Sequence, residues 1–190
     1  SAQLSAQDAQ KAQKAAQAAI ESDELNYEAV KKEIQKLIAA AASSKPQLSF
    51  TGFACPLKRY TRISSEYGWR KNPVTGVNKL HAGTDFAAPG GTPIYAIADG
   101  VVSAARTMNS YGNCVQVSHG TADDGHRYDS LYAHMSSIAV AQGAAVQKGD
   151  LLGYVGNTGN VYGAGGGYHL HLELRVDGSR VDPLGFVPTH

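Results

Sequence analysis

The residues best suited to chemistry lie in two short motifs that are far apart in the sequence. The first, His81-Ala-Gly-Thr-Asp85, places an imidazole and a carboxylate four residues apart. The second, His169-Leu-His171, opens a run of alternating polar and apolar residues, so in a strand both histidines project from one face. Two histidines and one carboxylate are a common ligand set for catalytic zinc, which leaves the fourth position for water. The two motifs together predict a metal site, although these residue types alone leave its use open.

A third motif, Tyr132-Ala-His134, lies between the other two in the sequence. Alternation along a strand would place Tyr132 and His134 on the same face. A histidine delivered in this way can hydrogen-bond a water on the metal without binding the metal itself. We therefore expect His134 beside the metal site, with Tyr132 as the aromatic candidate for a substrate groove.

Short strands are the elements that must position these motifs. Between residues 50 and 190, apolar or alternating runs are separated by turns rich in Gly, Asn and Asp, which is typical of antiparallel sheets. Gly83, inside the first motif, favours a loop leading into a strand over a helix. The region therefore predicts a mainly β fold, a compact antiparallel β-sheet domain, with strands near residues 93–98, 100–104, 114–118, 127–134 and 169–176.

The first 45 residues differ in composition from the rest of the chain. They are rich in Ala, Gln, Lys and Glu and contain no Gly or Pro, which favours helix. Heptad spacing predicts a coiled-coil seam that is convincing after Ile20, while Ser22 and Asp23 could cap a second helix and give two shorter ones. Because Pro46 ends the pattern, we expect a helical arm at 1–45 and a β domain at 46–190. The arm could self-associate, bind a regulatory helix or cover the cleft.

Charge and hydropathy exclude two classes of partner. The 17 Lys and Arg residues against 16 Asp and Glu leave a formal net charge of +1, so nucleic acid is not an expected partner. No run approaches the roughly 18 apolar residues of a membrane-spanning helix. Ser1 begins a polar stretch without the features of a signal peptide, so we expect an exported protein in its mature form.

The two cysteines, Cys55 and Cys114, lie 59 positions apart and lack the C-x-x-C spacing of zinc or redox sites. We expect them to form a structural disulfide. In an oxidising compartment it would stabilise the fold by roughly 4 kcal/mol in the chain-entropy model. Two buried free thiols are the alternative.

Residues 60–185 resemble the M23 peptidases, also called the lysostaphin or LytM type. The resemblance covers the whole β domain and leaves no motif of the site unmatched. One departure is Met135, where the family usually has Leu, an apolar exchange of similar volume. The matching segments are YGWRKNPVTG at 67–76, HAGTDFAAP at 81–89, GTPIYAIADG at 91–100, YAH at 132–134, KGDLLG at 148–153 and HLH at 169–171.

The resemblance implies that His81, Asp85 and His171 ligate one Zn²⁺ per chain. It also implies that His134 and His169 act on water and substrate, and we expect His134 as general base and His169 as stabiliser of the oxyanion. The implied fold is LytM-like, with an open groove. The implied function is a zinc endopeptidase that cleaves stem-peptide cross-links or glycine-containing bridges of peptidoglycan. Such an enzyme works outside the cell, in the cell envelope or with a phage.

Two other functions fit parts of the sequence. Residues 98–101 and 146–153 resemble the half-motifs of biotinyl and lipoyl carrier domains, but no lysine lies between residues 101 and 147 to carry a cofactor. A non-catalytic relative stays open as the alternative function. It would bind peptidoglycan or activate another wall hydrolase through the arm, although such relatives typically lack the zinc ligands.

Overall fold

The computed structural model describes residues 32, 52–71, 76–161 and 163–190. The chain divides into two units, Ser1–Lys45 and Pro46–His190. The helical arm expected at 1–45 lies outside the described residues, apart from Lys32, and stays a prediction. Within the described part of the chain, no helix combines the length and the apolar character needed to cross a membrane.

Strands dominate the described residues. Short 3-10 helices lie at Asn109–Tyr111, Ala164–Gly166 and Pro183–Gly185. The strands are β1 (Arg62–Ser65), β2 (Gly68–Lys71), β3 (Asn78–His81), β4 (Thr84–Ala87), β5 (Pro93–Tyr95), β6 (Gly100–Met108), β7 (Gly112–Thr121), β8 (Arg127–Ile138), β9 (Ala145–Val146), β10 (Leu151–Val155), β11 (His169–Val176) and β12 (Ser179–Val181).

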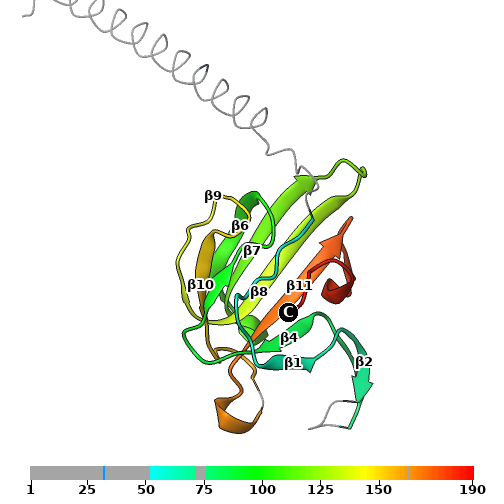
Figure 1. Ribbon diagram of the computed structural model, residues 1–190, viewed down its shortest axis with the longest axis vertical. Coiled ribbons are helices and arrows are strands. Elements are labelled where there is room, and N and C mark those ends of the chain that lie inside the picture. The colour runs from blue at the N-terminus through cyan, green and yellow to red at the C-terminus, as the bar shows by residue number, and fades with distance from the viewer. Residues whose placement is uncertain (1–31, 33–51, 72–75, 162) are drawn as a thin grey trace, which may run out of the picture. The chain divides into compact units, whose positions relative to one another are not determined.

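One antiparallel sheet of ten strands positions the site. Its main path runs β1-β4-β11-β8-β7-β6-β9, while β10 pairs with β5 and β8, and β12 pairs with β11. β2 and β3 form a separate two-stranded sheet. In Figure 1, β11 and β8 run side by side through the centre, with β4 and β1 on one flank and β7 and β6 on the other. The predicted mainly β, antiparallel fold is confirmed.

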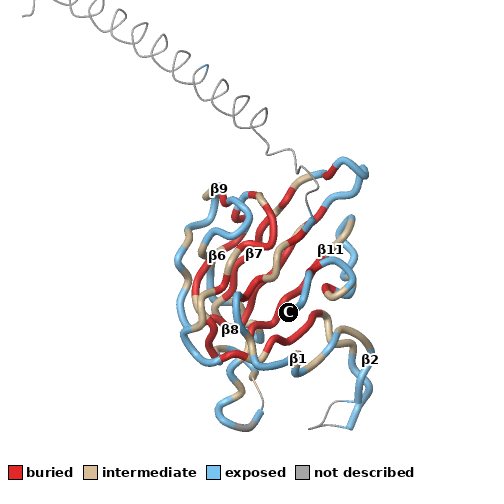
Figure 2. The backbone as a smooth tube through the Cα atoms, viewed as in Figure 1, coloured by how far each residue is buried: buried red, intermediate tan, exposed pale blue. Residues whose placement is uncertain are grey.

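Alternation along the central strands builds one large core. On β11, Leu170, Leu172 and Leu174 are fully buried and pack in a cluster with Phe86 and Ile94. Figure 2 shows the same burial along the middle of β7, β8 and β11. Burying one such side chain contributes about 1.5–3 kcal/mol relative to exposing it. The leucine face of β11 therefore anchors the sheet, and its opposite face is left for the histidines.

The expected disulfide between Cys55 and Cys114 is wrong, because both are free thiols. Cys114, in β7, packs in a small cluster against Leu131. The residues on either side of Cys55 instead bond to the backbone of Tyr95 and Ile97. Burial raises the pKa of both thiols. The segment around Cys55 and the strand that carries Cys114 are thus each held by their own contacts, without a covalent link between them.

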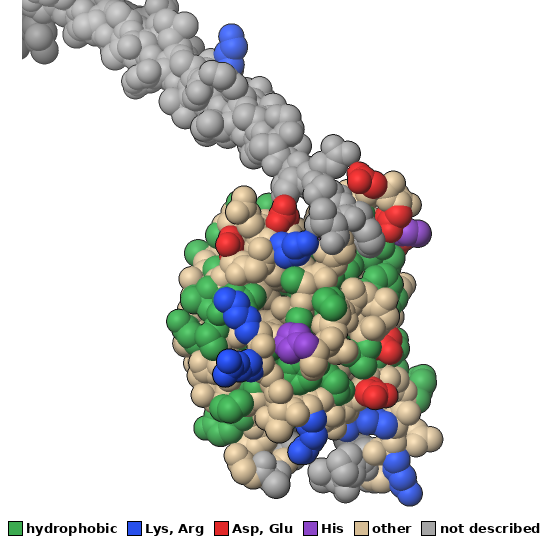
Figure 3. Space-filling view, viewed as in Figure 1, with side chains coloured by type: hydrophobic (Ala, Val, Ile, Leu, Met, Phe, Trp, Pro, Cys, Tyr) green, Lys and Arg blue, Asp and Glu red, His purple; other side chains and the backbone are tan. Residues whose placement is uncertain are grey.

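Charged side chains of both signs share the face shown in Figure 3. Lys and Arg are spread from the upper part of this face to its lower edge among neutral and apolar side chains, and Asp and Glu lie toward its upper and right edges. Among large apolar side chains in the described residues, Trp69 on β2 is the most exposed, at 77%. The mixture on this face follows from the near balance of 17 basic and 16 acidic residues in the chain.

Candidate metal centre

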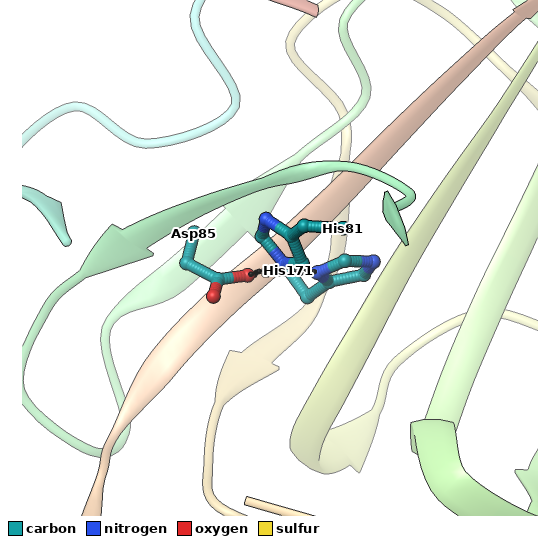
Figure 4. Close-up of side chains that lie close together, drawn as sticks. All are labelled: His81, Asp85 and His171. Atoms are coloured by element: carbon teal, nitrogen blue, oxygen red, sulfur yellow. Dashed lines mark hydrogen bonds and ion pairs between the residues drawn. The ribbon is translucent and has the colours of Figure 1, made fainter. Parts of the chain in front are cut away.

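His81, Asp85 and His171 converge from strands β3, β4 and β11, as Figure 4 shows. His171 and Asp85 are direct cross-strand partners, so their side chains lie on the same face of the sheet. Nε2 of His81 lies 3.2 Å from Oδ1 of Asp85 and 3.2 Å from Nδ1 of His171. Nδ1 of His171 lies 2.7 Å from the same Asp85 oxygen. The structure thus brings together the three residues that the sequence suggested as ligands.

The spacing of these three atoms suits a tetrahedral zinc ion. Bonds of about 2.0–2.1 Å at tetrahedral angles place neighbouring ligand atoms about 3.3 Å apart. Two of the separations are 3.2 Å. The third, 2.7 Å, is a hydrogen bond between His171 and Asp85 that metal ligation would replace. The donor set, two imidazole nitrogens and one carboxylate oxygen, could therefore hold a metal ion.

A backbone carbonyl fixes the ring of His81. Nδ1 of His81 lies 2.7 Å from the carbonyl oxygen of Glu66 and 3.2 Å from the hydroxyl of Ser65. Because a carbonyl oxygen can only accept, Nδ1 carries the proton and donates it. The lone pair of Nε2 is left facing Asp85 and His171, which is the tautomer that a metal requires.

Glu173 supports the candidate ligands from behind, although the sequence analysis did not include it among the site residues. Its side chain is fully buried behind His171, with Oε1 3.5 Å from Nε2 of that ring. Tyr111 donates its hydroxyl to Oε1 at 2.6 Å, and Arg175 and Arg180 donate to Oε2 at 3.1 and 3.0 Å. The carboxylate is fully paired and can hold the His171 ring in place. The alternating run of β11 contained the signal, since it puts Glu173 on the histidine face.

Neighbouring charges shift the pKa values of these residues. Burial raises the pKa of Asp85, but hydrogen bonds from His171 and His81 outweigh it and hold the pKa well below its ordinary range. Burial lowers the pKa of His171, but bonds to Asp85 and Glu173 outweigh it and raise the pKa to about 9. The pKa of Glu173 falls to about 2, because bonds from His171 and Tyr111 outweigh the effect of burial. A proton and a metal ion therefore compete for Nδ1 of His171.

Gly83 allows the first motif to approach β11 closely. A Cβ atom at this position would collide with the carbonyl oxygen of Leu172 and would come within 3.0 Å of Cε1 of His171. The collision involves backbone, which cannot move without disturbing the β4–β11 pairing. The glycine between His81 and Asp85 is therefore required by packing behind the His171 ring.

His134 reaches the site through a bulge in β8. Met135 pairs with Asn113, whereas Tyr132 pairs with Val115, so two residues of β8 oppose the single residue between Asn113 and Val115. The backbone of His134 has φ of 59°, in the left-handed region that costs roughly 1–2 kcal/mol for a residue with a Cβ. Its Nδ1 donates to the carbonyl oxygen of Thr158 at 2.8 Å. The bulge moves the imidazole to the histidine face of the sheet.

The expectation that Tyr132 shares a face with His134 is wrong. Tyr132 is fully buried in the main core, and its hydroxyl oxygen accepts from the backbone N–H of Ile97 at 2.9 Å. Regular alternation places it opposite Leu172, on the core face. The bulge at His134 reverses the alternation after Tyr132, so this tyrosine supports the sheet and cannot line a substrate groove.

His169 and His134 lie next to each other beside the candidate ligands. Their ring centroids are 4.7 Å apart, and the ring of His134 lies 5.8 Å from that of His171. Nδ1 of His169 donates to the carbonyl oxygen of Gly167 at 2.6 Å, and its Nε2 lies 3.7 Å from Oδ1 of Asp85. Burial lowers the pKa of His134 to about 4, although its bond to Thr158 opposes the shift. The ring of His134 is therefore neutral at physiological pH.

Residues 79–183 match the family model of Peptidase family M23. Among curated proteins, the DD-carboxypeptidase/endopeptidase Mpg of Neisseria meningitidis serogroup B is 42% identical over 125 residues, which are 66% of this chain and 27% of the relative. The peptidoglycan DD-endopeptidase ShyA of Vibrio cholerae serotype O1 is 42% identical over 130 residues, 68% of this chain and 28% of the relative. The chain thus spans about a quarter of the length of these relatives.

Solved structures show the same fold. A zinc-containing peptidase from Vibrio cholerae aligns with a TM-score of 0.60 and 36% identity, over 69% of this chain and 39% of that chain. The catalytic domain of the antimicrobial peptidase lysostaphin from Staphylococcus simulans aligns with a TM-score of 0.55 and 28% identity, over 66% of this chain and 90% of that chain. The family match covers more than half of the chain and includes all five residues expected at the site, so this chain belongs to Peptidase family M23.

Proposed function

We propose that this chain is a zinc-dependent endopeptidase unit that hydrolyses peptide bonds of bacterial peptidoglycan. The observation that carries the proposal is the triangle of donor atoms from His81, Asp85 and His171, with the rings of His134 and His169 beside it. A site that served structure alone would close the metal with a fourth protein ligand, whereas three ligands with further histidines nearby suit hydrolysis.

The proposed metal ligands are Nε2 of His81, Oδ1 of Asp85 and Nδ1 of His171, which would hold one zinc ion per chain. When bound, zinc supplies a Lewis acid that polarises a carbonyl group and lowers the pKa of water toward about 7. The protein holds the ligands in place through the Glu66 carbonyl behind His81 and the Glu173 carboxylate behind His171.

His134 is the proposed general base. Its Nδ1–H is committed to Thr158, which leaves the lone pair of Nε2 to accept a proton from water and return it to the leaving amine. His169 is the proposed stabiliser of the oxyanion. Nδ1 of His169 donates to the carbonyl oxygen of Gly167, and Nε2 lies 3.7 Å from Oδ1 of Asp85, which places that nitrogen beside the proposed reaction site.

Peptidoglycan is the proposed substrate because the curated relatives are named for it. ShyA is named a peptidoglycan DD-endopeptidase, and Mpg a DD-carboxypeptidase/endopeptidase. These names favour stem-peptide cross-links over glycine-containing bridges. The proposed place of action is accordingly the cell envelope, the extracellular space or a phage particle.

Zinc content and turnover, measured together on two variants, test the assignment. We expect His171→Ala to lose zinc and hydrolysis of purified wall, because it removes a ligand. We expect His134→Ala to keep about one zinc per chain and lose at least about a hundredfold in turnover, the scale of general-base catalysis. Elemental analysis and release of wall fragments provide the two readouts. Loss of metal from His134→Ala would overturn its role as base, and a zinc-loaded protein that binds wall without cutting it would favour the non-catalytic alternative.

A further inference from the structure

A polar pocket lies on the same sheet face as the candidate metal centre. It measures about 190 Å³, and its lining includes Arg127 and Asp129 of β8 and Arg175 of β11. Cross-strand register fixes its place. His171 lies opposite Ala133, and four residues further along β11, Arg175 lies opposite Asp129. At about 3.3 Å per residue, Arg175 at the edge of the pocket lies about 13 Å along β11 from His171.

Two guanidinium groups give the Arg127–Arg175 pocket its character. Nη2 of Arg127 donates to Asp129 at 3.1 Å and to Ser118 at 3.4 Å, and Nη2 of Arg175 donates to Glu173 at 3.1 Å. A guanidinium has five N–H donors, so in the described part of the chain Nε and Nη1 of both arginines are left to bind a ligand. The Arg127 side chain is 60% exposed and that of Arg175 is 31% exposed.

The charges around the pocket favour an anion. Among the residues that line the pocket, Arg127 and Arg175 are basic and Asp129 is acidic, so two positive charges face one negative charge. The lining also includes Ser103 and Gln116, whose side chains have no hydrogen-bond partner among the described residues. A carboxylate is planar and has two acceptor oxygens, so it can accept hydrogen bonds from the guanidinium N–H groups and from the Gln116 amide. An uncharged ligand would lack the electrostatic attraction to the arginines.

We infer that the Arg127–Arg175 pocket binds a carboxylate of the substrate peptide. The inference rests on the proposed function, which supplies a peptide whose branches end in free carboxylates. An extended chain advances at most about 3.3–3.6 Å per residue, so a carboxylate about four residues from the scissile bond reaches the pocket. Between His171 and Arg175 on this face of β11 lies Glu173, which accepts hydrogen bonds from Tyr111 and Arg180.

The experiment compares one substrate in two charge states. A fluorescently labelled, cross-linked peptide fragment of purified wall is used as isolated and after its carboxylates have been converted to amides. Binding to the zinc-loaded full chain is measured by fluorescence anisotropy, and hydrolysis by chromatography of the fragments. We expect the carboxylate form to bind roughly tenfold more tightly, the scale of one charge-assisted hydrogen bond, with the difference in KM rather than in kcat.

Two variants and one control connect the preference to the pocket. Arg127→Gln and Arg175→Gln should each reduce the preference to less than about threefold, whereas Arg59→Gln, an exposed arginine outside the pocket, should retain it. Arg127 is the cleaner test, because Arg175 also bonds to Glu173. Equal binding of the two peptide forms, or an unchanged preference in both pocket variants, would overturn the inference.

The two readouts keep this inference apart from the proposed function. Cleavage of both peptide forms without any preference would leave the endopeptidase standing and refute the pocket. An arginine-dependent preference in binding, with no cleavage of either form by the zinc-loaded protein, would support the pocket and refute the endopeptidase.

Discussion

The proton on His171 links metal affinity to pH. The bonds of this ring to Asp85 and Glu173 raise its pKa to about 9, and zinc binds only the neutral ring. Below that pKa the proton must leave before the metal enters. We therefore expect the apparent zinc affinity to rise about tenfold per pH unit between about pH 6 and pH 8 from this group alone. Competition with a chelator of known affinity measures it, and a flat profile over this range would contradict the assignment of Nδ1 as ligand.

Glu173 should also affect the zinc affinity, because its carboxylate lies behind the His171 ring. Replacing Glu173 with Gln removes the charge that orients His171 but keeps the side-chain shape. We expect Glu173→Gln to weaken zinc binding about ten- to a hundredfold, the usual effect of losing an outer-shell partner. The matched control is Asp123→Asn, an exposed carboxylate in a turn. If both variants bind zinc as tightly as the unsubstituted protein, Glu173 acts in folding alone.

At the scale of elements, the bulge in β8 and the turn after β10 act together on His134. The Thr158 hydroxyl donates to the carbonyl of Met135 at 2.7 Å and accepts from the N–H of Asn113 at 2.9 Å, while its own carbonyl accepts from His134. Gly159 packs so closely on Gly112 that a Cβ on it would collide with backbone. The turn is thus locked to the strand that carries the proposed base.

Thr158→Val should therefore lower turnover without loss of zinc. The change removes both hydroxyl bonds and lets His134 shift, and we expect kcat to fall about ten- to a hundredfold, as a misplacement of about 1 Å can cause. Thr158→Ser keeps the hydroxyl and should restore most of kcat. Thr121→Val, at an exposed residue that ends β7, serves as the control. A Ser variant as slow as the Val variant would show that the methyl group, and not the hydrogen bonds, positions the base.

The sequence could predict those parts of the site that depend on regular alternation. The leucine face of β11 and the convergence of His81, Asp85 and His171 followed from motif spacing and resemblance. Tyr132 was misplaced because a period of two was extended through a bulge, and no residue type in Tyr-Ala-His marks a left-handed φ. The prediction of a disulfide failed for a similar reason. The spacing of two cysteines along the chain contains no information about where the fold places their thiols.

At the scale of the whole molecule, the fold holds both of its cysteines as free thiols. We expect the protein, unfolded in denaturant without reductant, to show two reactive thiols per chain by colorimetric titration. In the folded protein, Cys114 is buried and Cys55 partly exposed, so Cys55→Ser should remove the faster reaction. Finding no reactive thiols in the unfolded chain would show that Cys55 and Cys114 form a disulfide after all.

Removal of residues 1–45 separates the proposed arm from the β domain. All described members of the core and of the candidate metal centre lie beyond this boundary, so the shortened protein should fold and retain zinc. We expect the deletion to change either the rate on intact wall or the oligomeric state, measured by fragment release and light scattering. If both stay the same, the arm neither self-associates nor covers the cleft.

The left-handed backbone of His134 restricts how a protein of this shape could lose its activity in evolution. Asn and Gly adopt this conformation at little cost, whereas most other residues would strain the bulge. We therefore expect an inactive homologue that has kept this fold to carry Asn or Gly at this position more often than Ala or Leu. Because Asn adopts a left-handed φ at little cost, His134→Asn is a suitable inactive variant for trapping bound wall fragments without disturbing the bulge.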